Sequence, residues 1–471
     1  MFDRITAAEA AAERWDVVIA GSSFSAMFFL RGLPRDARVL IVEKGPLIPH
    51  AVQVEERSRP QEPIALDNRS DMPKRWVAHT MFGGNSNCWW GQVPRFHPAD
   101  FRLFEDHGVG APWPLDYDAL EPFYAEVEQV MEVAGPDDDP VHPRSGPFPY
   151  PPHTLSRTDA ACIAARPDIW LPVACARANG GARNPCCANG VCDLCPVDSK
   201  FSILNGMGAF TREGVRIAME TELRQVDIAA GAATGVLLRD ADGAETRVHA
   251  GHVALGTNAI GNAAILLRSG LTSPALGRYL HEQTSQDVIL DVGAPNYFGG
   301  TSITGHCFAF YDGAHRDTTA AALVENYNAP NELRSDRGRW IERMRLKLIA
   351  EDLPQPGNRI TLDDAGEPQI TWLGHSHYAY AGIARAEERL ADILPFPVEG
   401  IVGKRFSHTE AHIQGTHRMG HDPTQSVTDD LLRCHGLGGL HALGSGAFPT
   451  SSAANPTLTL SALALRAGRS V

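Results

Sequence analysis

The first pattern along the chain is an apolar strand, a turn of small residues and an apolar helix. Residues 16–20 form a short apolar run of the kind that a buried parallel strand needs. Gly21 follows at once, residues 27–30 are apolar, and a second strand-like run, residues 38–42, leads into Glu43. This order predicts a βαβ unit near the N-terminus.

The turn after the first strand has the small residues of a dinucleotide-binding loop. Gly21, Ser23 and Ala26 occupy the places where such a loop turns tightly, approaches a pyrophosphate and packs against a helix. Glu43 stands 22 residues after Gly21, where an acidic side chain binds an adenosine ribose. The alternatives are an unrelated strand-turn-helix and a solvated carboxylate at a strand end. Because the strands, the turn, the helix and Glu43 all have the spacing of a dinucleotide-binding unit, we expect a nucleotide site.

Two later segments, residues 118–134 and 376–394, have the apolar spacing of amphipathic helices. Composition narrows the class of protein further. The chain has 471 residues, enough for two structural units, and a formal net charge of −14, which argues against a nucleic-acid ligand. No run of about 18 apolar residues suggests a membrane span. The N-terminus has no secretory or twin-arginine pattern, so we expect a cytoplasmic location unless a partner subunit carries the chain into the periplasm.

The C-terminal block carries the strongest signal. From Ala411 the sequence reads AHIQGTHRMGHDPTQSV and continues to GSGAFPTSSAANPTLTL, which resembles the closing segment of the glucose-methanol-choline (GMC) oxidoreductases. Other blocks follow in the family's order: the nucleotide loop, MFGGNSNCWWGQVPRF from Met81, VALGTNAIGNAAILL from Val253 and NRITLDDAGEPQITW from Asn358. The motifs are nearest to those of bacterial FAD-dependent sugar dehydrogenases and pyranose oxidases.

The resemblance implies an α/β fold with two interleaved domains. A Rossmann-like FAD-binding domain is expected from residues 1–100, 200–285 and 405–471. A substrate-binding domain, built on a large mixed or antiparallel sheet backed by helices, is expected from residues 101–199 and 286–404, with a cysteine-rich loop at 184–200. Both amphipathic helices would belong to the substrate side.

The resemblance also implies a catalytic pair. Oxidation of an alcohol removes a hydroxyl proton and a carbon-bound hydride, and imidazole is well suited to take the proton. The family's base lies three residues before a Gly-Thr pair, which is the position of His412. Asn455 heads the N-P-T-L-T stretch, and its amide can hold the substrate oxygen. His417 and His421 do not match the catalytic position and are interpreted as structural.

FAD is the implied cofactor. A helix after Asn455 would point its N-terminus at the flavin, where its dipole and free amides stabilise negative charge. The expected FAD contacts are Gly21, Ser23, Phe24, Ser25, Ala26, Glu43, Lys44, Gly83, Gly84, Asn85, Ser86, Cys88, Trp89, Leu223, Gly256, Gly444, Ser445, Gly446, Ala447, Pro456 and Thr457. In several sugar-oxidising relatives a His stands at the position of Cys88, so a histidyl link to flavin is excluded here. A cysteinyl link and a small packed thiol are the alternatives, and the packed thiol is preferred.

Four cysteines, Cys186, Cys187, Cys192 and Cys195, form a C-C-x4-C-x2-C-P segment. Adjacent cysteines suit a zinc site poorly, and disulfides need an oxidising compartment. A tight loop that ends in Cys-Pro is typical of iron–sulfur proteins, and bacterial FAD-dependent glucose dehydrogenases have a [3Fe-4S] cluster on a similar motif. We therefore expect an iron–sulfur cluster, with an unmetallated or disulfide-bonded loop as the alternative.

Together these patterns predict an FAD-dependent dehydrogenase that oxidises the CH–OH group of a sugar or another small alcohol. The electrons would pass to an external acceptor, either a cytochrome or a small partner subunit. Haem is not expected on this chain, because it has no C-x-x-C-H motif. An oxidase that uses O₂ and a lyase on the same fold are the alternatives.

Overall fold

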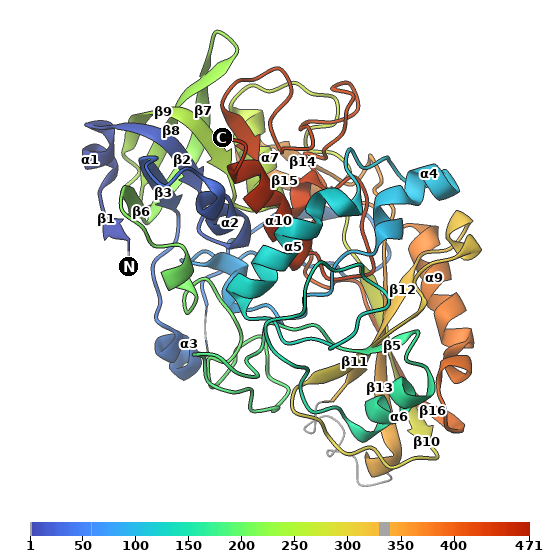
Figure 1. Cartoon of the computed structure of the whole chain (residues 1–471). Helices are drawn as coiled ribbons and strands as arrows, with labels where there is room; N and C mark the ends of the chain where they lie inside the picture. Colours follow the sequence, from blue (N-terminus) through green and yellow to red (C-terminus); the bar gives the residue numbers. More distant parts are fainter. Residues whose placement is uncertain (1, 58, 329–339) are drawn as a thin grey trace.

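The structure is a computed structural model that describes residues 2–57, 59–328 and 340–471. Within these residues the chain forms a mixed sheet, an antiparallel sheet and a small third sheet, with helices packed on them (Figure 1). Every helix among the described residues is too short or too polar to span a bilayer. The helices not discussed below are α1 (Ala7–Ala11), α3 (His50–Glu56), α4 (Leu103–His107) and α6 (Arg157–Ala165).

The mixed sheet contains the predicted βαβ unit. In spatial order its strands are β1 (Asp3–Arg4), β6 (Val215–Met219), β3 (Val39–Glu43), β2 (Arg14–Ala20), β9 (Glu245–Leu255), β8 (Ala232–Asp240) and β7 (Thr221–Ala229), with β17 (Leu440–Ala442) also paired to β9. β2 pairs in parallel with β3 and β9, and α2 (Phe24–Gly32) connects β2 to β3. Pairing turns antiparallel from β9 to β7. The Rossmann-like topology is confirmed.

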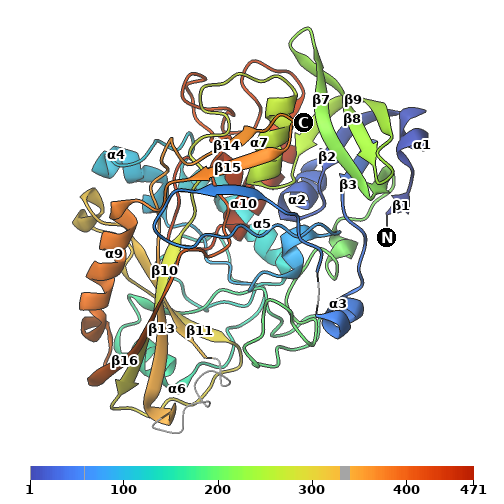
Figure 2. The same cartoon turned by 180° about the vertical axis from the view of Figure 1, so that it is seen from behind.

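Helices from three distant parts of the sequence pack together beside this sheet. α10 (Thr457–Gly468) is apolar on almost every side and packs on α2 and on α5 (Tyr117–Met131) (Figures 1 and 2). The helix expected after Asn455 is therefore confirmed, and it joins the core that surrounds the nucleotide loop. α5 is also confirmed as a helix. It packs on α10, and its expected place in the substrate domain stays a prediction.

The antiparallel sheet contains, in spatial order, β16 (Val398–Ser407), β10 (Thr284–Val292), β13 (Arg343–Ala350), β12 (Ala322–Tyr327), β11 (Ile303–Phe310) and β5 (Trp170–Pro172). α9 (His377–Glu388), within the predicted segment 376–394, packs on β10, β12 and β13. Val324 and Leu348 lie in the apolar cluster on that side. Because side chains alternate along a strand, Glu325 and Lys347 point to the opposite face. This alternation gives the sheet one apolar face and one charged face.

A small sheet of β14 (Arg359–Leu362), β15 (Pro368–Trp372) and β4 (Ala65–Asn68) lies beside α7 (Ala259–Arg268) (Figure 2). The expected fold class, a Rossmann-like α/β unit with a second sheet backed by a helix, is confirmed. Strands of the mixed sheet come from residues 3–43, 215–255 and 440–442, so that sheet is discontinuous in sequence. The domain boundaries stay a prediction.

Candidate active site

A cavity of about 110 Å³ lies at the carboxyl end of β2. The carboxyl ends of parallel strands are where open α/β sheets bind nucleotides. Thr257 and Asn258, at the start of α7, also line the cavity and were not among the expected contacts. The expected contacts that line it are Gly21, Ser23, Glu43, Lys44, Gly84 and Leu223.

The backbone at Gly21 fits a dinucleotide loop. Gly21 has φ +88°, and a Cβ there would lie 2.7 Å from the carbonyl oxygen of Gly256, so the chain can turn this tightly only with glycine. Ser23 precedes α2 but makes no side-chain capping bond. The first amides of α2 are therefore available to an anion such as a pyrophosphate.

Glu43 lies at the end of β3 and is only 6% exposed. Its carboxylate accepts hydrogen bonds from the Ser22 hydroxyl at 2.5 Å and from the Gly45 amide at 2.8 Å. Burial raises the pKa of Glu43 to about 7, although both hydrogen bonds act to lower it. The Ser22 hydroxyl also accepts from the Gly83 amide at 2.8 Å. Ser22, which was not predicted, therefore joins the nucleotide loop to the segment that begins at Met81.

That second segment wraps around the start of α2. The Asn85 side chain accepts from the His79 amide at 2.9 Å, and the Ser86 hydroxyl accepts from the Ile203 amide at 3.1 Å. Their hydrogen bonds fix the shape of the loop. The Trp89 ring stands edge-on to Phe24 with the ring centroids 4.8 Å apart. The segment that begins at Met81 and the nucleotide loop are thus in direct contact.

Residues 444–448 pass between α2 and the histidine segment. A Cβ on Gly446 would lie 1.9 Å from the His417 ring, so the loop and this ring are packed in direct contact. The Ser445 hydroxyl donates to the Ile413 carbonyl at 2.6 Å. His417 is fully buried and lies 3.3 Å from the Leu443 carbonyl, which agrees with its structural interpretation. His421 is exposed.

His412 lies where charged groups of the antiparallel sheet can act on it. Its Nδ1 is hydrogen-bonded to Oε1 of Gln283, and its backbone amide donates to Glu282 at 3.2 Å. Burial lowers the pKa of His412 to about 4; Lys347 acts in the same direction and Glu325 opposes it. The imidazole is therefore neutral at pH 7.

Asn455 and His412 are connected through one side chain. Nε2 of Gln283 donates to the carbonyls of Ser452 at 2.6 Å and Ala454 at 2.7 Å, immediately before Asn455. Oδ1 of Asn455 is buried and has no hydrogen-bond partner among the described residues. An unpaired buried oxygen is costly, so this amide suits a group that binds a ligand. The structure thus brings the two predicted catalytic segments together.

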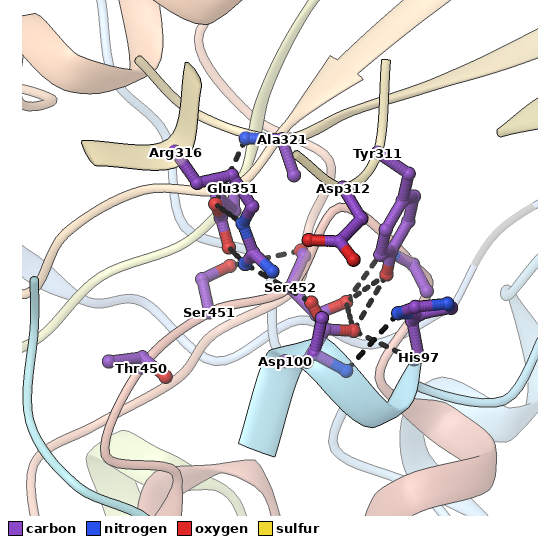
Figure 3. Close-up of polar contacts among 12 residues, drawn as sticks. His97, Asp100, Tyr311, Asp312, Arg316, Ala321, Glu351, Thr450, Ser451 and Ser452 are labelled. Carbon is purple, nitrogen blue, oxygen red and sulfur yellow. Dashed lines mark hydrogen bonds and ion pairs between the residues drawn. The ribbon is translucent and has the colours of Figure 1, made fainter. Parts of the chain in front are cut away.

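A buried polar network holds the other side of the same segment (Figure 3). The Ser452 hydroxyl donates to Asp100 at 2.9 Å and lies 2.6 Å from the Tyr311 hydroxyl, which also donates to Asp100 at 2.8 Å. Arg316 pairs with Asp100 at 3.3 Å and with Glu351 at 2.7 Å. No sequence motif predicts this network, because its members are far apart along the chain.

The chain was compared with known proteins. Residues 354–464 match the family model described as GMC oxidoreductase. The chain is 26% identical to the fructose dehydrogenase large subunit of Gluconobacter japonicus over 97% of both chains. It is 27% identical to the 6'''-hydroxyparomomycin C oxidase of Streptomyces lividus, over 97% of this chain and 91% of that one. Residues 354–464 of the chain are thus similar to the GMC oxidoreductases. The fold of the chain also matches the crystal structure of pyridoxine 4-oxidase from Mesorbium loti, with a TM-score of 0.67, 17% identity and coverage of 97% of this chain and 99% of that one.

Cys88 has the environment of a packed thiol. Its Sγ donates to the Asn85 carbonyl at 3.4 Å. Burial raises the pKa of the Cys88 thiol, while Lys200 and Arg59 act to lower it. A cysteinyl link needs a thiolate, so the raised pKa favours the packed-thiol alternative.

The structure does not support an iron–sulfur cluster at residues 186–195. Among the described residues, no group of three or more His, Cys, Asp or Glu is placed to hold a metal ion. All four thiols are free of disulfide bonds. Their surroundings differ: Cys186 Sγ contacts Thr301 Oγ1 at 3.4 Å, Cys192 Sγ contacts Ser302 Oγ at 3.0 Å, Cys195 Sγ accepts from the Ser199 amide at 3.3 Å, and Cys187 is exposed. The unmetallated loop is the alternative that the structure favours.

A row of charged side chains crosses the antiparallel sheet on the face away from α9. His306, Glu325, Lys347 and Asp287 are neighbours across β11, β12, β13 and β10. Glu325 is 2% exposed, and its Oε1 lies 3.3 Å from His306 Nε2 without the geometry of a hydrogen bond. Lys347 pairs with Glu410 at 2.6 Å. Lys347 and Glu325 both act on the pKa of His412, so these two members of the row lie near the imidazole.

Proposed function

We propose that this chain is an FAD-dependent oxidoreductase that oxidises a CH–OH group of a sugar or related polyol, with His412 as the base. The observation that carries the proposal is the half-buried, neutral His412 imidazole, which Gln283 connects by hydrogen bonds to the segment that leads into Asn455. The match to a fructose dehydrogenase large subunit over nearly the whole of both chains supports the reaction class.

The residues around the cavity fit the adenosine half of FAD. Glu43 would accept hydrogen bonds from the ribose, and the amides at the start of α2 would bind the pyrophosphate. Gly444 to Ala447 and the start of α10 would hold the remainder of the cofactor. Bound FAD supplies a hydride acceptor at its flavin N5.

His412 and Asn455 would divide the work on the substrate hydroxyl. His412 would accept the hydroxyl proton through Nε2, because Nδ1 is already engaged by Gln283. Glu325 favours the protonated form of His412 and would stabilise the imidazolium that results. The amide of Asn455 would bind the substrate oxygen and orient the carbon–hydrogen bond.

The charged row supports a substrate with several polar groups. Glu325 has an oxygen without a hydrogen-bond partner among the described residues, and Lys347 lies beside it across the strands. A hydroxyl can donate to such a carboxylate and accept from such an ammonium. A polyol therefore matches this face better than a hydrocarbon alcohol, which would leave the Glu325 oxygen without a hydrogen bond.

Two versions of the function differ in the electron acceptor. The fructose dehydrogenase large subunit supports transfer to an external acceptor on a partner subunit or cytochrome, and the paromomycin-related oxidase supports transfer to O₂. A protein reduced anaerobically by substrate separates them. Reoxidation by an artificial acceptor but not by air supports the dehydrogenase, and rapid reoxidation in air with release of peroxide supports the oxidase.

The decisive experiment replaces His412. The FAD-loaded enzyme is mixed anaerobically with a panel of D-fructose, D-glucose, methyl glucosides and simple alcohols, and bleaching of the flavin absorbance is followed by stopped flow. We expect His412→Ala to keep FAD and to lose about 10²- to 10⁴-fold in reduction rate. His421→Ala, at an exposed histidine, is the matched control and should reduce normally. A wild-type rate in His412→Ala contradicts the proposal.

A further inference from the structure

We propose that Gln283 is a positioning residue that fixes the tautomer of His412, with the proton on Nδ1 and a free lone pair on Nε2. The base role of Nε2 rests on the proposed function. The tautomer itself follows from hydrogen bonding and can be measured without a substrate.

The orientation of the Gln283 amide is determined by two backbone carbonyls. Gln283 is fully buried, and one end of its amide lies 2.6 Å and 2.7 Å from the carbonyl oxygens of Ser452 and Ala454. Only the NH₂ end can donate to carbonyls. A flipped amide would place Oε1 against two acceptors and leave all three oxygens unpaired in a buried site. The NH₂ end therefore faces the carbonyls.

The orientation of the amide determines the proton on His412. With the NH₂ end committed to the carbonyls, Oε1 is the end that faces Nδ1 of His412. A carbonyl oxygen only accepts, so Nδ1 must carry the hydrogen. In a neutral imidazole the other nitrogen then has the lone pair. One amide thus leaves Nε2 unprotonated.

A neutral partner at Nδ1 also matters for the pKa of His412. The charged groups that act on the imidazole are Lys347 on β13 and Glu325 on β12, while Glu282 accepts from its backbone amide and Glu410 pairs with Lys347. Lys347 lowers the pKa of His412 and Glu325 raises it, so their effects oppose one another. An amide at Nδ1 fixes the ring without adding the charge of a carboxylate, so it keeps the imidazole neutral over a wide pH range.

The same segment of backbone is held from its other side by Tyr311 and Ser452. The Ala454 amide donates to the Ser452 hydroxyl at 3.0 Å and to the Tyr311 hydroxyl at 3.3 Å. Tyr311→Phe therefore disturbs this segment without touching His412. It is the matched control that separates positioning of the imidazole from a general structural effect.

The test is ¹⁵N NMR of the FAD-loaded enzyme labelled at histidine, with the His412 signals assigned from a His412→Asn variant. We expect His412 in the wild type to be neutral from pH 8 to pH 6, with Nδ1 protonated. Gln283→Leu should give a mixture of the two tautomers. Gln283→Glu, nearly equal in size, should raise the pKa of His412 by about 1 to 3 units, because a carboxylate stabilises the imidazolium. Tyr311→Phe should leave both the tautomer and the pKa unchanged.

Two results overturn the proposal: a wild-type His412 protonated on Nε2, or Gln283 variants with the wild-type tautomer and pKa. If Gln283→Leu does not fold, the wild-type spectrum and Gln283→Glu still decide the question. The proposed function fails separately. If no alcohol bleaches the flavin while the spectra are as expected, the assignment of Gln283 stands and the oxidoreductase reaction does not.

Discussion

Arg316 pairs with two carboxylates, Asp100 and Glu351, in the buried network of Figure 3. We expect Arg316→Met to destabilise the protein strongly. The Arg316 side chain is 0% exposed. Nη2 lies 2.7 Å from Glu351 and 3.3 Å from Asp100, both of which are equally buried. Methionine is close to arginine in length and apolar, so the substitution mainly removes the charge and leaves two carboxylates without their cation.

The expected loss follows from that uncompensated charge. Removal of one partner of a buried ion pair costs about 3 to 5 kcal/mol. Asp100 keeps donors from Tyr311 and Ser452, and Glu351 keeps the Ala321 amide at 2.9 Å, so both carboxyl groups remain hydrogen-bonded. These donors reduce the cost of each remaining charge. We therefore expect a loss of free energy of unfolding within the range of about 3 to 5 kcal/mol at pH 8.

The loss should depend on pH in a defined direction. Burial raises the pKa of both Asp100 and Glu351, and Arg316 acts to lower both. Without the arginine, both folded-state pKa values rise further above those of the unfolded chain. A carboxyl group of this kind binds more protons in the folded state, so its contribution to stability falls as pH rises. Arg316→Met should thus be closer to the wild type at pH 5 than at pH 8.

Urea titrations followed by tryptophan fluorescence at both pH values give the free energies of unfolding. Arg389→Met is the matched control, because Arg389 pairs with Asp392 at 3.1 Å at the surface, with side chains 53% and 59% exposed. An exposed pair contributes less than about 1 kcal/mol. The reasoning is refuted if Arg316→Met costs no more than Arg389→Met, or if its cost is equal at pH 5 and pH 8.

Two further variants test the nucleotide site. Glu43→Gln should weaken FAD binding by about ten- to a hundredfold, since it removes charge-assisted hydrogen bonds to the ribose, and titration of the FAD-free protein measures this. Between pH 5 and pH 7 the FAD-free wild type should lose stability as pH rises, because the folded pKa of Glu43 is raised to about 7, and Glu43→Gln should lack this slope. Gly21→Ala should abolish FAD binding because its Cβ would meet the Gly256 carbonyl, whereas Gly108→Ala, with φ +66° but nothing within 4 Å, should bind FAD normally. Equal FAD affinity in the two alanine variants would contradict the steric argument.

Local sequence patterns predict the helices and strands better than they predict which elements pack against one another. The strand, turn and helix around Gly21 are encoded within about 30 residues, and periodicity alone indicates such a unit. α5 was predicted as a helix from its apolar spacing, but that spacing says only which face is buried. Its partner α10 lies more than 300 residues away in sequence, and nothing local distinguishes α10 from the antiparallel sheet as the covering surface.

In the candidate site, too, local motifs identify some residues, and the roles of others depend on tertiary contacts. His412 and Asn455 stand in motifs that resemble a family, so they were identified by position. Gln283 and Glu325 stand in no such motif, and their roles depend on which strands pair and which face points to His412. The iron–sulfur cluster predicted from the cysteine segment is not supported, for a related reason. Spacing brings thiols near one another along the chain, but the direction of each Sγ depends on contacts with residues such as Thr301 and Ser302.

The buried charges near the candidate site are best explained by the placement of one short segment. An apolar cluster could replace Asp100, Arg316 and Glu351 without loss of stability, since desolvation offsets much of what such ions gain. It could not supply the directed acceptor that Asp100 provides to the Ser452 and Tyr311 hydroxyls. Those hydroxyls accept from the Ala454 amide while Gln283 binds the carbonyls on either side of Ala453. The backbone that leads into Asn455 is therefore fixed at both its donors and its acceptors, and the cluster contributes the position of a reacting group as well as stability.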